Sequence, residues 1–221
     1  MSALLFGSIS TVADTSELQR RAFNEAFEAH GLDWNWSRDE YVSMLGSNGG
    51  RDRIAQFARG RNEDVDADAV HSTKSAIFQE MLSSAGVSAR PGVVETIERA
   101  RQDGVRLGFV TTTSADNVEA VLAALAPAIG PDTFDLIVDG SAVSTGKPDP
   151  EVYRYALDKL GEDAAHAVAI EDNVGGVRAA TDAGLTCVAF PNENTSGGDF
   201  TAAETTVEAL RPDDIAALIK L

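Results

Sequence analysis

Five short apolar segments recur along the chain, and each is bounded by glycine or polar residues. They lie at Ala3–Ile9, Val105–Val110, Phe134–Val138, Ala167–Ile170 and Cys187–Phe190. Successive positions within each segment are apolar, so both faces of a strand formed there would be apolar. This pattern is typical of strands that are buried in a parallel sheet.

Helical patterns accompany the later strands. They cover Val93–Arg101, Asn117–Leu125, Pro150–Leu160 and Val174–Ala183. Ser114 is a suitable N-cap for the second pattern, and Gly161 and Gly184 follow the ends of the last two. The alternation of strands and helices predicts right-handed crossovers and an α/β fold with a doubly wound parallel sheet.

A block of helices interrupts this alternation after the first strand. Residues 14–88 contain amphipathic patterns and no strand pattern, beginning with Thr15–His30. We therefore expect an α/β core formed by residues 1–13 and 89–221, with residues 14–88 inserted as a helical cap. Within the cap, Trp34 and Trp36 are expected to pack between helices. Residues 191–206 are expected to form a surface loop, and Pro212–Leu221 a last helix.

Charge narrows the classes of partner. The 221 residues include 18 Lys and Arg against 35 Asp and Glu, a net charge of −17. That field repels nucleic acid and anionic membranes, but a few focused donors can still hold a small anion. The single cysteine, Cys187, has no partner for a disulfide within the chain, which suits a cytoplasmic protein. We expect neither a signal peptide nor a membrane span.

Polar residues with related chemistry follow three of the predicted strands. They are Thr111-Thr112-Thr113-Ser114, Gly146-Lys147-Pro148 and Glu171-Asp172. In an open α/β sheet, ligands bind beyond the carboxyl ends of the strands. Hydroxyls, backbone N–H groups and one ammonium form a phosphate cradle, and a pair of carboxylates can hold Mg²⁺. Taken singly, these residues could instead be a capped turn, a solvated lysine and carboxylates at a helix N-terminus.

The order of these motifs, together with a helical cap after the first strand, resembles the haloacid-dehalogenase superfamily. The likeness is greatest to its β-phosphoglucomutase-like branch, which includes sugar-bisphosphate phosphatases of Calvin-cycle operons. The resemblance implies that Thr111 and Thr112 bind a phosphoryl group, that Lys147 stabilises it, and that Glu171 and Asp172 hold Mg²⁺. It also implies that Arg51 and Lys74 grip the distal part of a sugar phosphate. Both could equally lie on a solvated cap helix.

The first motif of the family departs from its pattern here. That motif is Asp-x-Asp-Gly-Thr, in which one aspartate attacks phosphorus and the other is the general acid/base. Anchored on Phe6 and Thr11, the sequence places Gly7 at the nucleophile and Ile9 at the acid/base. Gln19 stands where the branch often has a histidine. Losing a nucleophile costs on the order of 10⁶ in turnover, about 8 kcal/mol of barrier. Mg²⁺ binding is expected to weaken as well, because Gly7 supplies no carboxylate.

Nearby hydroxyls offer a substitute nucleophile, but no base to activate them is evident in the sequence. The hydroxyls belong to Ser8, Ser10 and Thr11, and the histidines are all distant along the chain, at His30, His71 and His166. Three functions therefore remain open. The chain could bind a small phosphorylated metabolite with little or no hydrolysis, hydrolyse a sugar phosphate by a substitute nucleophile or by direct attack of water, or serve as a non-catalytic interaction module.

Overall fold

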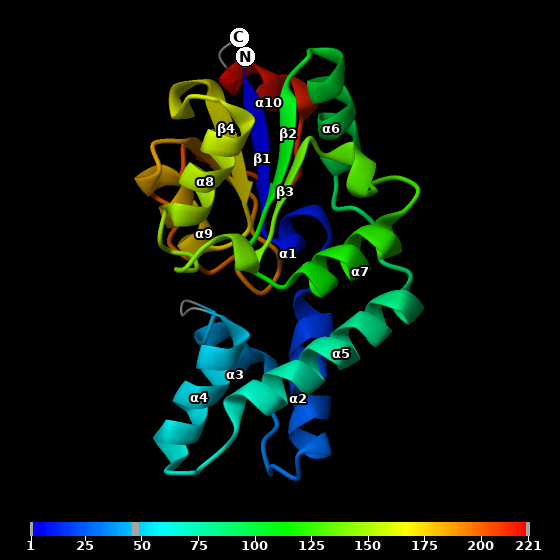
Figure 1. Cartoon of the computed structure of the whole chain (residues 1–221), viewed down its shortest axis with the longest axis vertical. Coiled ribbons are helices and arrows are strands. Elements are labelled where there is room, and N and C mark those ends of the chain that lie inside the picture. The colour runs from blue at the N-terminus through cyan, green and yellow to red at the C-terminus, as the bar shows by residue number, and fades with distance from the viewer. Residues whose placement is uncertain (1, 46–48, 220–221) are drawn as a thin grey trace.

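The computed structural model describes residues 2–45 and 49–219, and its upper part in Figure 1 is built on a parallel sheet. The strand order is β3-β2-β1-β4-β5-β6, with every pairing parallel. The strands are β1 (Ala3–Gly7), β2 (Arg106–Val110), β3 (Leu136–Val138), β4 (Ala167–Glu171), β5 (Thr186–Ala189) and β6 (Thr205–Thr206). The predicted doubly wound α/β fold is confirmed.

Helices cover both faces of this sheet. They are α6 (Val93–Gln102), α7 (Ala115–Leu125), α8 (Glu151–Leu160), α9 (Val174–Asp182) and α10 (Pro212–Leu218), with short turns η1 (Pro131–Thr133), η2 (Gly140–Ala142) and η3 (Ala164–His166). Alternate residues of β1 enter different cores. Leu4 and Phe6 pack with residues of α6 and α7, whereas Ala3 and Leu5 pack with residues of α8 and α9. Burial on both faces explains why the strand segments are continuously apolar.

Two predicted elements differ from the structure. The first strand ends at Gly7 rather than Ile9, because Ser8 turns the chain with φ 76° and caps the short helix α1 (Ile9–Val12). The segment expected to be a loop contains β6, whose two exposed threonines carry no apolar signal. The predicted last helix ends at Leu218, and residues 220 and 221 lie outside the described residues.

The inserted segment forms its own helical layer, in the lower part of Figure 1. It contains α2 (Ser16–Ala29), α3 (Arg38–Ser43), α4 (Gly50–Arg61) and α5 (Ala67–Ala85). Its core is aromatic, and Trp36 is fully buried with its ring centroid 4.6 Å from that of Phe27. Trp34 is buried beside them, as expected for packing between helices. The division into core and cap at residues 13/14 and 88/89 stays a prediction.

Strand register brings the polar segments to one edge of the sheet. Gly7 of β1 lies opposite Val110 of β2 and Glu171 of β4. Thr111 and Asp172, the next residues after Val110 and Glu171, therefore lie on either side of the turn that follows Gly7. This edge faces the helical layer, while both chain termini lie at the opposite end of the core (Figure 1). Within the described ranges, no helix is long and apolar enough to cross a membrane.

Candidate functional site

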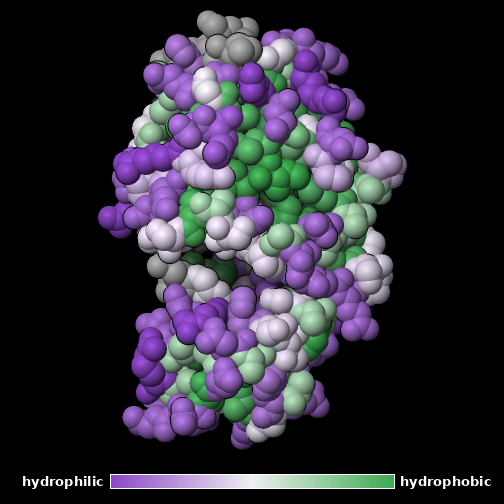
Figure 2. All heavy atoms as spheres, in the orientation of Figure 1, coloured by the Kyte–Doolittle hydropathy of each residue, from purple (hydrophilic) through white to green (hydrophobic). Residues whose placement is uncertain are grey.

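A cleft of about 430 Å³ lies between the carboxyl edge of the sheet and the cap helices. Figure 2 shows the molecule hollowed where its two parts meet. The core contributes Ser8, Ile9, Thr111, Thr112, Lys147, Asp172 and Asn192, and the cap contributes Gln19, Arg51, Arg53, His71 and Lys74. The structure thus brings six of the predicted site residues to one cleft: Thr111, Thr112, Lys147, Asp172, Arg51 and Lys74.

The strand-end hydroxyls and Lys147 form one wall of the cleft. Thr111 is buried, and its Oγ1 accepts a hydrogen bond from the Thr113 N–H at 3.2 Å. The Lys147 Nζ donates to the Val110 carbonyl at 2.8 Å and to Glu171 Oε1 at 2.7 Å. Its third contact, with the Tyr153 hydroxyl, is longer at 3.4 Å. A phosphate oxygen could replace that weakest contact without breaking the other two.

Glu171 does not line the cleft, because its carboxylate is buried beside Gly7 and Gly176. The side chain is fully buried, and Oε1 accepts from the Tyr153 hydroxyl at 2.6 Å as well as from Lys147. Burial raises the pKa of Glu171, and the Lys147 ammonium opposes that shift. Burial and the neighbouring carboxylate raise the pKa of Tyr153 well above its usual value. Tyr153 therefore keeps its proton and donates it to Glu171 Oε1.

Two glycines leave the space that the Glu171 carboxylate fills. A Cβ on Gly7 would lie 2.6 Å from Glu171 Cδ, and closer still to Glu171 Oε1 and the Tyr153 hydroxyl. A Cβ on Gly176 would overlap the same carboxylate from the side of α9. Position 7 therefore has no side chain, and the Glu171 carboxylate and the Tyr153 hydroxyl occupy the space in which one would lie. Ile9, at the second position of the motif, lies on the cleft wall and is almost fully buried.

Asp172, by contrast, faces the cleft and receives a hydrogen bond from Ser8. The Ser8 hydroxyl donates to Asp172 Oδ1 at 2.7 Å. The sequence made no base evident for the nearby hydroxyls, and the structure places the Asp172 carboxylate beside that of Ser8. The residues are 164 positions apart, so only the parallel pairing of β1 with β4 brings them together. Burial raises the pKa of Asp172, while hydrogen bonds from Ser8 and Asn173 lower it.

On the cap side, a group of basic residues faces the same cleft. Lys74 is 3% exposed, donates to Gln19 Oε1 at 2.9 Å and lies over the rings of Phe23 and Phe78. Burial, aided by repulsion from Arg53, lowers the pKa of Lys74 to about 7. Arg51 is instead half-exposed and paired with Asp68 and Asp52 at the rim.

Sequence reasoning missed Arg53 and Asn192, and it left His71 as a distant histidine. Arg53 is buried, contacts the Met44 carbonyl and lies over the rings of Phe23 and Tyr41. Its two-residue spacing from Arg51 carried no signal, because residues so spaced in a helix such as α4 lie on different sides of it. Burial lowers the pKa of His71, and Lys74 adds repulsion. For Asn192, only the tertiary contact with Asp172 identifies a role.

Few side chains in this cleft could serve as ligands of Mg²⁺. Within the described part of the chain, no three His, Cys, Asp or Glu side chains lie close enough together to hold a metal ion. Asp172 is the one carboxylate of the predicted pair that faces the cleft, and its oxygens already accept hydrogen bonds from Ser8, Asn173 and Asn192. The residues present therefore do not fit the cation that the motif implies.

Comparison with known proteins identifies the family of this chain. A family profile described as haloacid dehalogenase-like hydrolase matches residues 10–190, most of the chain. The chain belongs to the haloacid dehalogenase-like hydrolase family. The match begins beyond Gly7 and Ile9, the residues that the sequence analysis aligned with the two aspartates of the family's first motif.

Within the haloacid dehalogenase-like family, the chain is similar to proteins named CbbY. It is 40% identical to CbbY of Rhodobacter capsulatus over 214 residues, which cover 95% of this chain and 94% of that protein. The crystal structure of CbbY from Rhodobacter sphaeroides with phosphate has 39% identity and a TM-score of 0.89, covering 95% and 94% of the two chains. A variant of that protein with xylulose 1,5-bisphosphate has 37% identity and a TM-score of 0.91 over the whole of both chains.

Proposed function

We propose that this protein binds a small phosphorylated metabolite in the cleft and does not hydrolyse it through an aspartyl-phosphate. The observation that carries this proposal is the filled space beside Gly7. A covalent step requires a nucleophile aimed at phosphorus, and glycine has no side chain to supply one. The Glu171 carboxylate and the Tyr153 hydroxyl lie where such a side chain would begin.

The phosphoryl group is expected to lie at the strand ends, against Thr111, Thr112 and Lys147. These residues combine hydroxyls with the ammonium of Lys147, and all three line the cleft. Cations at the far side of the cleft suit a second anionic group of the ligand. Arg53 is buried there, and its desolvated charge attracts an anion more strongly than an exposed one would. Lys74, whose pKa is about 7 in the free protein, would be held protonated by the bound anion. Arg51 is expected to contribute less because Asp68 and Asp52 already pair with it.

A sugar bisphosphate is the ligand class that matches two basic ends joined by a polar cleft. A substituted variant of CbbY from Rhodobacter sphaeroides, which resembles this chain along its whole length, has been crystallised with xylulose 1,5-bisphosphate. Basic side chains in the cleft can attract such an anion despite the net charge of −17, because a cleft focuses the local field. A cytoplasmic location stays a prediction that rests on the single, buried cysteine Cys187.

Two measurements on the same panel of sugar mono- and bisphosphates test this proposal. Phosphate release, assayed with Mg²⁺ present, is expected not to exceed the blank, and a turnover of about 1 s⁻¹ or above would overturn the proposal. Calorimetry is expected to give a Kd of about 1 mM or tighter for at least one bisphosphate. Lys147→Ala should weaken that binding at least tenfold. Lys159→Ala, which removes an exposed lysine on α8, is the matched control.

The contact between Ser8 and Asp172 favours a second candidate, slow hydrolysis with Ser8 as the phosphoryl acceptor. The Ser8 hydroxyl would attack phosphorus, pass its proton to Asp172 and break the ester bond, and the leaving alkoxide would take a proton from water. The hydroxide so formed would recover the proton from Asp172, and a second water would cleave the phosphoserine to release phosphate and restore Ser8. Slow release of phosphate, with phosphoserine at position 8 detected by mass spectrometry and lost in Ser8→Ala, would favour this candidate. Absence of both turnover and binding would leave an interaction module.

A further inference from the structure

The carboxylate of Asp172 is surrounded by hydrogen-bond donors from the protein itself. Oδ1 accepts from Ser8 Oγ at 2.7 Å and from Asn173 Nδ2 at 2.9 Å, and Oδ2 accepts from Asn192 Nδ2 at 3.0 Å. The side chain is only 4% exposed. Both oxygens therefore have neutral partners before any ligand arrives.

Backbone contacts fix the orientation of the two amides that face Asp172. Asn173 Oδ1 accepts from the Gly176 N–H at 2.9 Å, as the N-cap of α9. Asn192 Oδ1 accepts from the backbone N–H groups of Asn194 and Thr195, at 2.9 and 3.1 Å. With their oxygens engaged in this way, both side chains must point their NH₂ groups at the carboxylate. Amide hydrogens in those positions repel a cation and cannot coordinate it.

The third donor, Ser8, is held in a backbone conformation that residues other than glycine rarely adopt. Its φ is 76° and its ψ is 151°. The Ser8 N–H donates to the Val110 carbonyl at 3.2 Å, and its Oγ accepts from the Ser10 N–H at 3.2 Å. These contacts hold the hydroxyl over Asp172. Ser8 lies between Gly7 and Ile9, so the donor belongs to the same segment that departs from the family's motif.

The other carboxylates that could complete a cation site point elsewhere. Glu171 is buried against Lys147 and Tyr153, with its Oε2 next to Gly176 rather than in the cleft. Position 7 supplies no carboxylate. Mg²⁺ prefers nearly ideal octahedral oxygen ligation and gives up its water reluctantly. Asp172 alone, already hydrogen-bonded at both oxygens, is a poor competitor for that hydration shell.

We propose that this cleft holds its phosphorylated ligand without a divalent cation. Ser8, Asn173 and Asn192 contact Asp172 in the place that a metal ion would otherwise take. This inference rests on the proposed function for the identity of the ligand. The statement about the cation stands on the donor set alone. Charge neutralisation of the phosphoryl group then falls to Lys147, which is in contact with the same edge of the sheet.

A titration with Mn²⁺, which substitutes for Mg²⁺ and is visible by electron paramagnetic resonance, tests the cation directly. The native protein and Asp172→Asn are expected to give the same curve, with only weak surface binding from the acidic exterior. One equivalent of Mn²⁺ bound more tightly than about 100 μM by the native protein, and lost in Asp172→Asn, would overturn the inference. Circular dichroism checks that the variant is folded.

If Asp172→Asn does not fold, the native protein still decides the question by NMR. The side-chain amide signals of Asn173 and Asn192 should keep their line widths as Mn²⁺ is added. Selective broadening of those two signals would place the ion beside Asp172 and contradict the inference.

A second experiment separates this inference from the proposed function. The Kd of inorganic phosphate, and of xylulose 1,5-bisphosphate, is measured in EDTA and in 5 mM Mg²⁺. Values within twofold of each other support cation-independent binding, whereas tenfold tighter binding in Mg²⁺ refutes it. No binding in either buffer would refute the proposed function, and the Mn²⁺ titration would still answer the question of the cation.

Discussion

At the scale of single residues, two neighbouring carboxylates have opposite surroundings. Glu171 is the last residue of β4 and lies level with Gly7, so its side chain enters the space beside that glycine. Asp172 is one residue further on, beyond the strand, and faces the cleft. Successive residues of a strand point to opposite sides. A single step along the chain therefore separates a buried structural carboxylate from one that can contact a ligand.

Adding one methyl group at position 7 tests how tightly this space is filled. Gly7→Ala is expected to lower the free energy of unfolding by about 1–3 kcal/mol, because the Cβ overlaps the Tyr153 hydroxyl and the Glu171 carboxylate. In a Tyr153→Phe background the added cost should be smaller, giving a favourable coupling in a double-mutant cycle of urea unfolding.

Gly60→Ala is the matched control for this cycle. Gly60 lies within α4, and beyond its chain neighbours and the nearby helix backbone no atom lies within 4 Å of the Cβ that it would gain. Because alanine favours a helix more than glycine does, this control should gain up to about 1 kcal/mol. Equal stabilities for Gly7→Ala and the native protein would show that Glu171 and Tyr153 move aside without cost.

Lys74 should make stability depend on pH in a specific direction. Its pKa of about 7 in the folded protein lies below the value of about 10.4 expected in the unfolded chain. Between these values the unfolded chain binds more protons, so the free energy of unfolding rises with pH, by up to about 1.4 kcal/mol per pH unit. Arg53 and His71 face the same cleft and stay in place in the variant used for comparison.

Urea unfolding at pH 7, 8 and 9 measures this dependence, with Lys74→Met as the comparison. The free energy of unfolding of the native protein should rise relative to that of Lys74→Met across this range. Parallel curves for the two proteins would mean that Lys74 has an ordinary pKa and that its burial is relieved by solvent or by a partner.

At the scale of elements, apolar periodicity predicted the sheet and its helices because each strand core is buried on both faces. Leu4, Leu5 and Phe6 are fully buried, and no polar residue interrupts them. The same signal failed at Ile9, which is equally apolar but follows a turn set by the backbone of Ser8. It also missed Thr205–Thr206, since a two-residue exposed edge strand is held by backbone hydrogen bonds and not by burial.

Arg90 precedes α6 and lies outside the sheet, yet it holds the segments that follow β1 and β5 in place. Its guanidinium donates to the carbonyls of Ser10, Phe190 and Pro191, at 3.1, 2.7 and 2.7 Å. It also lies 3.4 Å from the centroid of the Phe190 ring. These contacts tie α1 to the end of β5, just before Asn192. Arg90 therefore positions both the Ser8 turn and the loop that reaches Asp172.

We expect Arg90→Met to lower the free energy of unfolding by at least about 3 kcal/mol, because hydrogen bonds from a charged donor are each worth about 1.5–3 kcal/mol and three are lost together. Arg90→Lys should recover little, since an ammonium lacks the planar fork that spans three carbonyls. Arg178→Met, which removes an exposed arginine on α9, should change stability by less than about 0.5 kcal/mol. A similar small effect for Arg90→Met would contradict this role.

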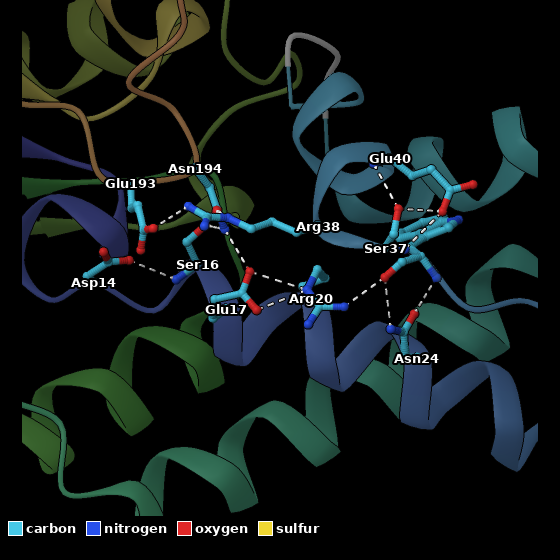
Figure 3. A network of polar contacts seen from close by, with 11 residues as sticks. Asp14, Ser16, Glu17, Arg20, Asn24, Ser37, Arg38, Glu40, Glu193 and Asn194 are labelled. Carbon is cyan, nitrogen blue, oxygen red and sulfur yellow. Dashed lines mark hydrogen bonds and ion pairs between the residues drawn. The ribbon is translucent and has the colours of Figure 1, made fainter.

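At the scale of the whole molecule, the candidate site is complete only when the cap lies against the core. Thr111 and Lys147 belong to the core, whereas Lys74 and Arg53 belong to helices of the inserted segment. A cluster of side chains joins the two parts on the side of α2 (Figure 3). Asn194 Nδ2 donates to Ser16 Oγ at 2.7 Å and to Glu17 at 3.1 Å, and Arg38 Nε donates to Asn194 Oδ1 at 2.8 Å.

This contact could not be predicted from the sequence, whereas the two halves that it joins could. Arg38 and Asn194 are 156 positions apart, and no periodicity or motif links a cap arginine to an asparagine in a polar loop. The strand-end motifs were recognisable because each lies at a fixed distance from an apolar strand. The orientation of Glu171 was not, because it depends on the space left by Gly7 and Gly176, which only the packed structure reveals.

The contact between cap and core should depend mainly on Asn194, and this differs from what ion pairing alone predicts. The Arg38–Glu193 pair is short at 2.7 Å, but its side chains are 44% and 75% exposed, so it should contribute no more than about 1 kcal/mol. Asn194 is 3% exposed, and its loss would remove the partner of Ser16 Oγ and of Arg38 Nε at a cost of about 1–3 kcal/mol.

Asn194→Ala should therefore loosen the cap, whereas Glu193→Ala should have little effect. Hydrogen exchange at the start of α2 is expected to rise by about tenfold in Asn194→Ala, the change that a loss of about 1.4 kcal/mol produces when opening is local. Arg61→Ala, which breaks an exposed ion pair with Glu63 inside the cap, controls for general loosening.

Because Asn192 and Thr195 of the same loop contact Asp172, the affinity of Asn194→Ala for a bisphosphate should fall together with this protection from exchange. Equal exchange rates in Asn194→Ala and Arg61→Ala would show that the cap is held by the packing of α5 on α7 instead.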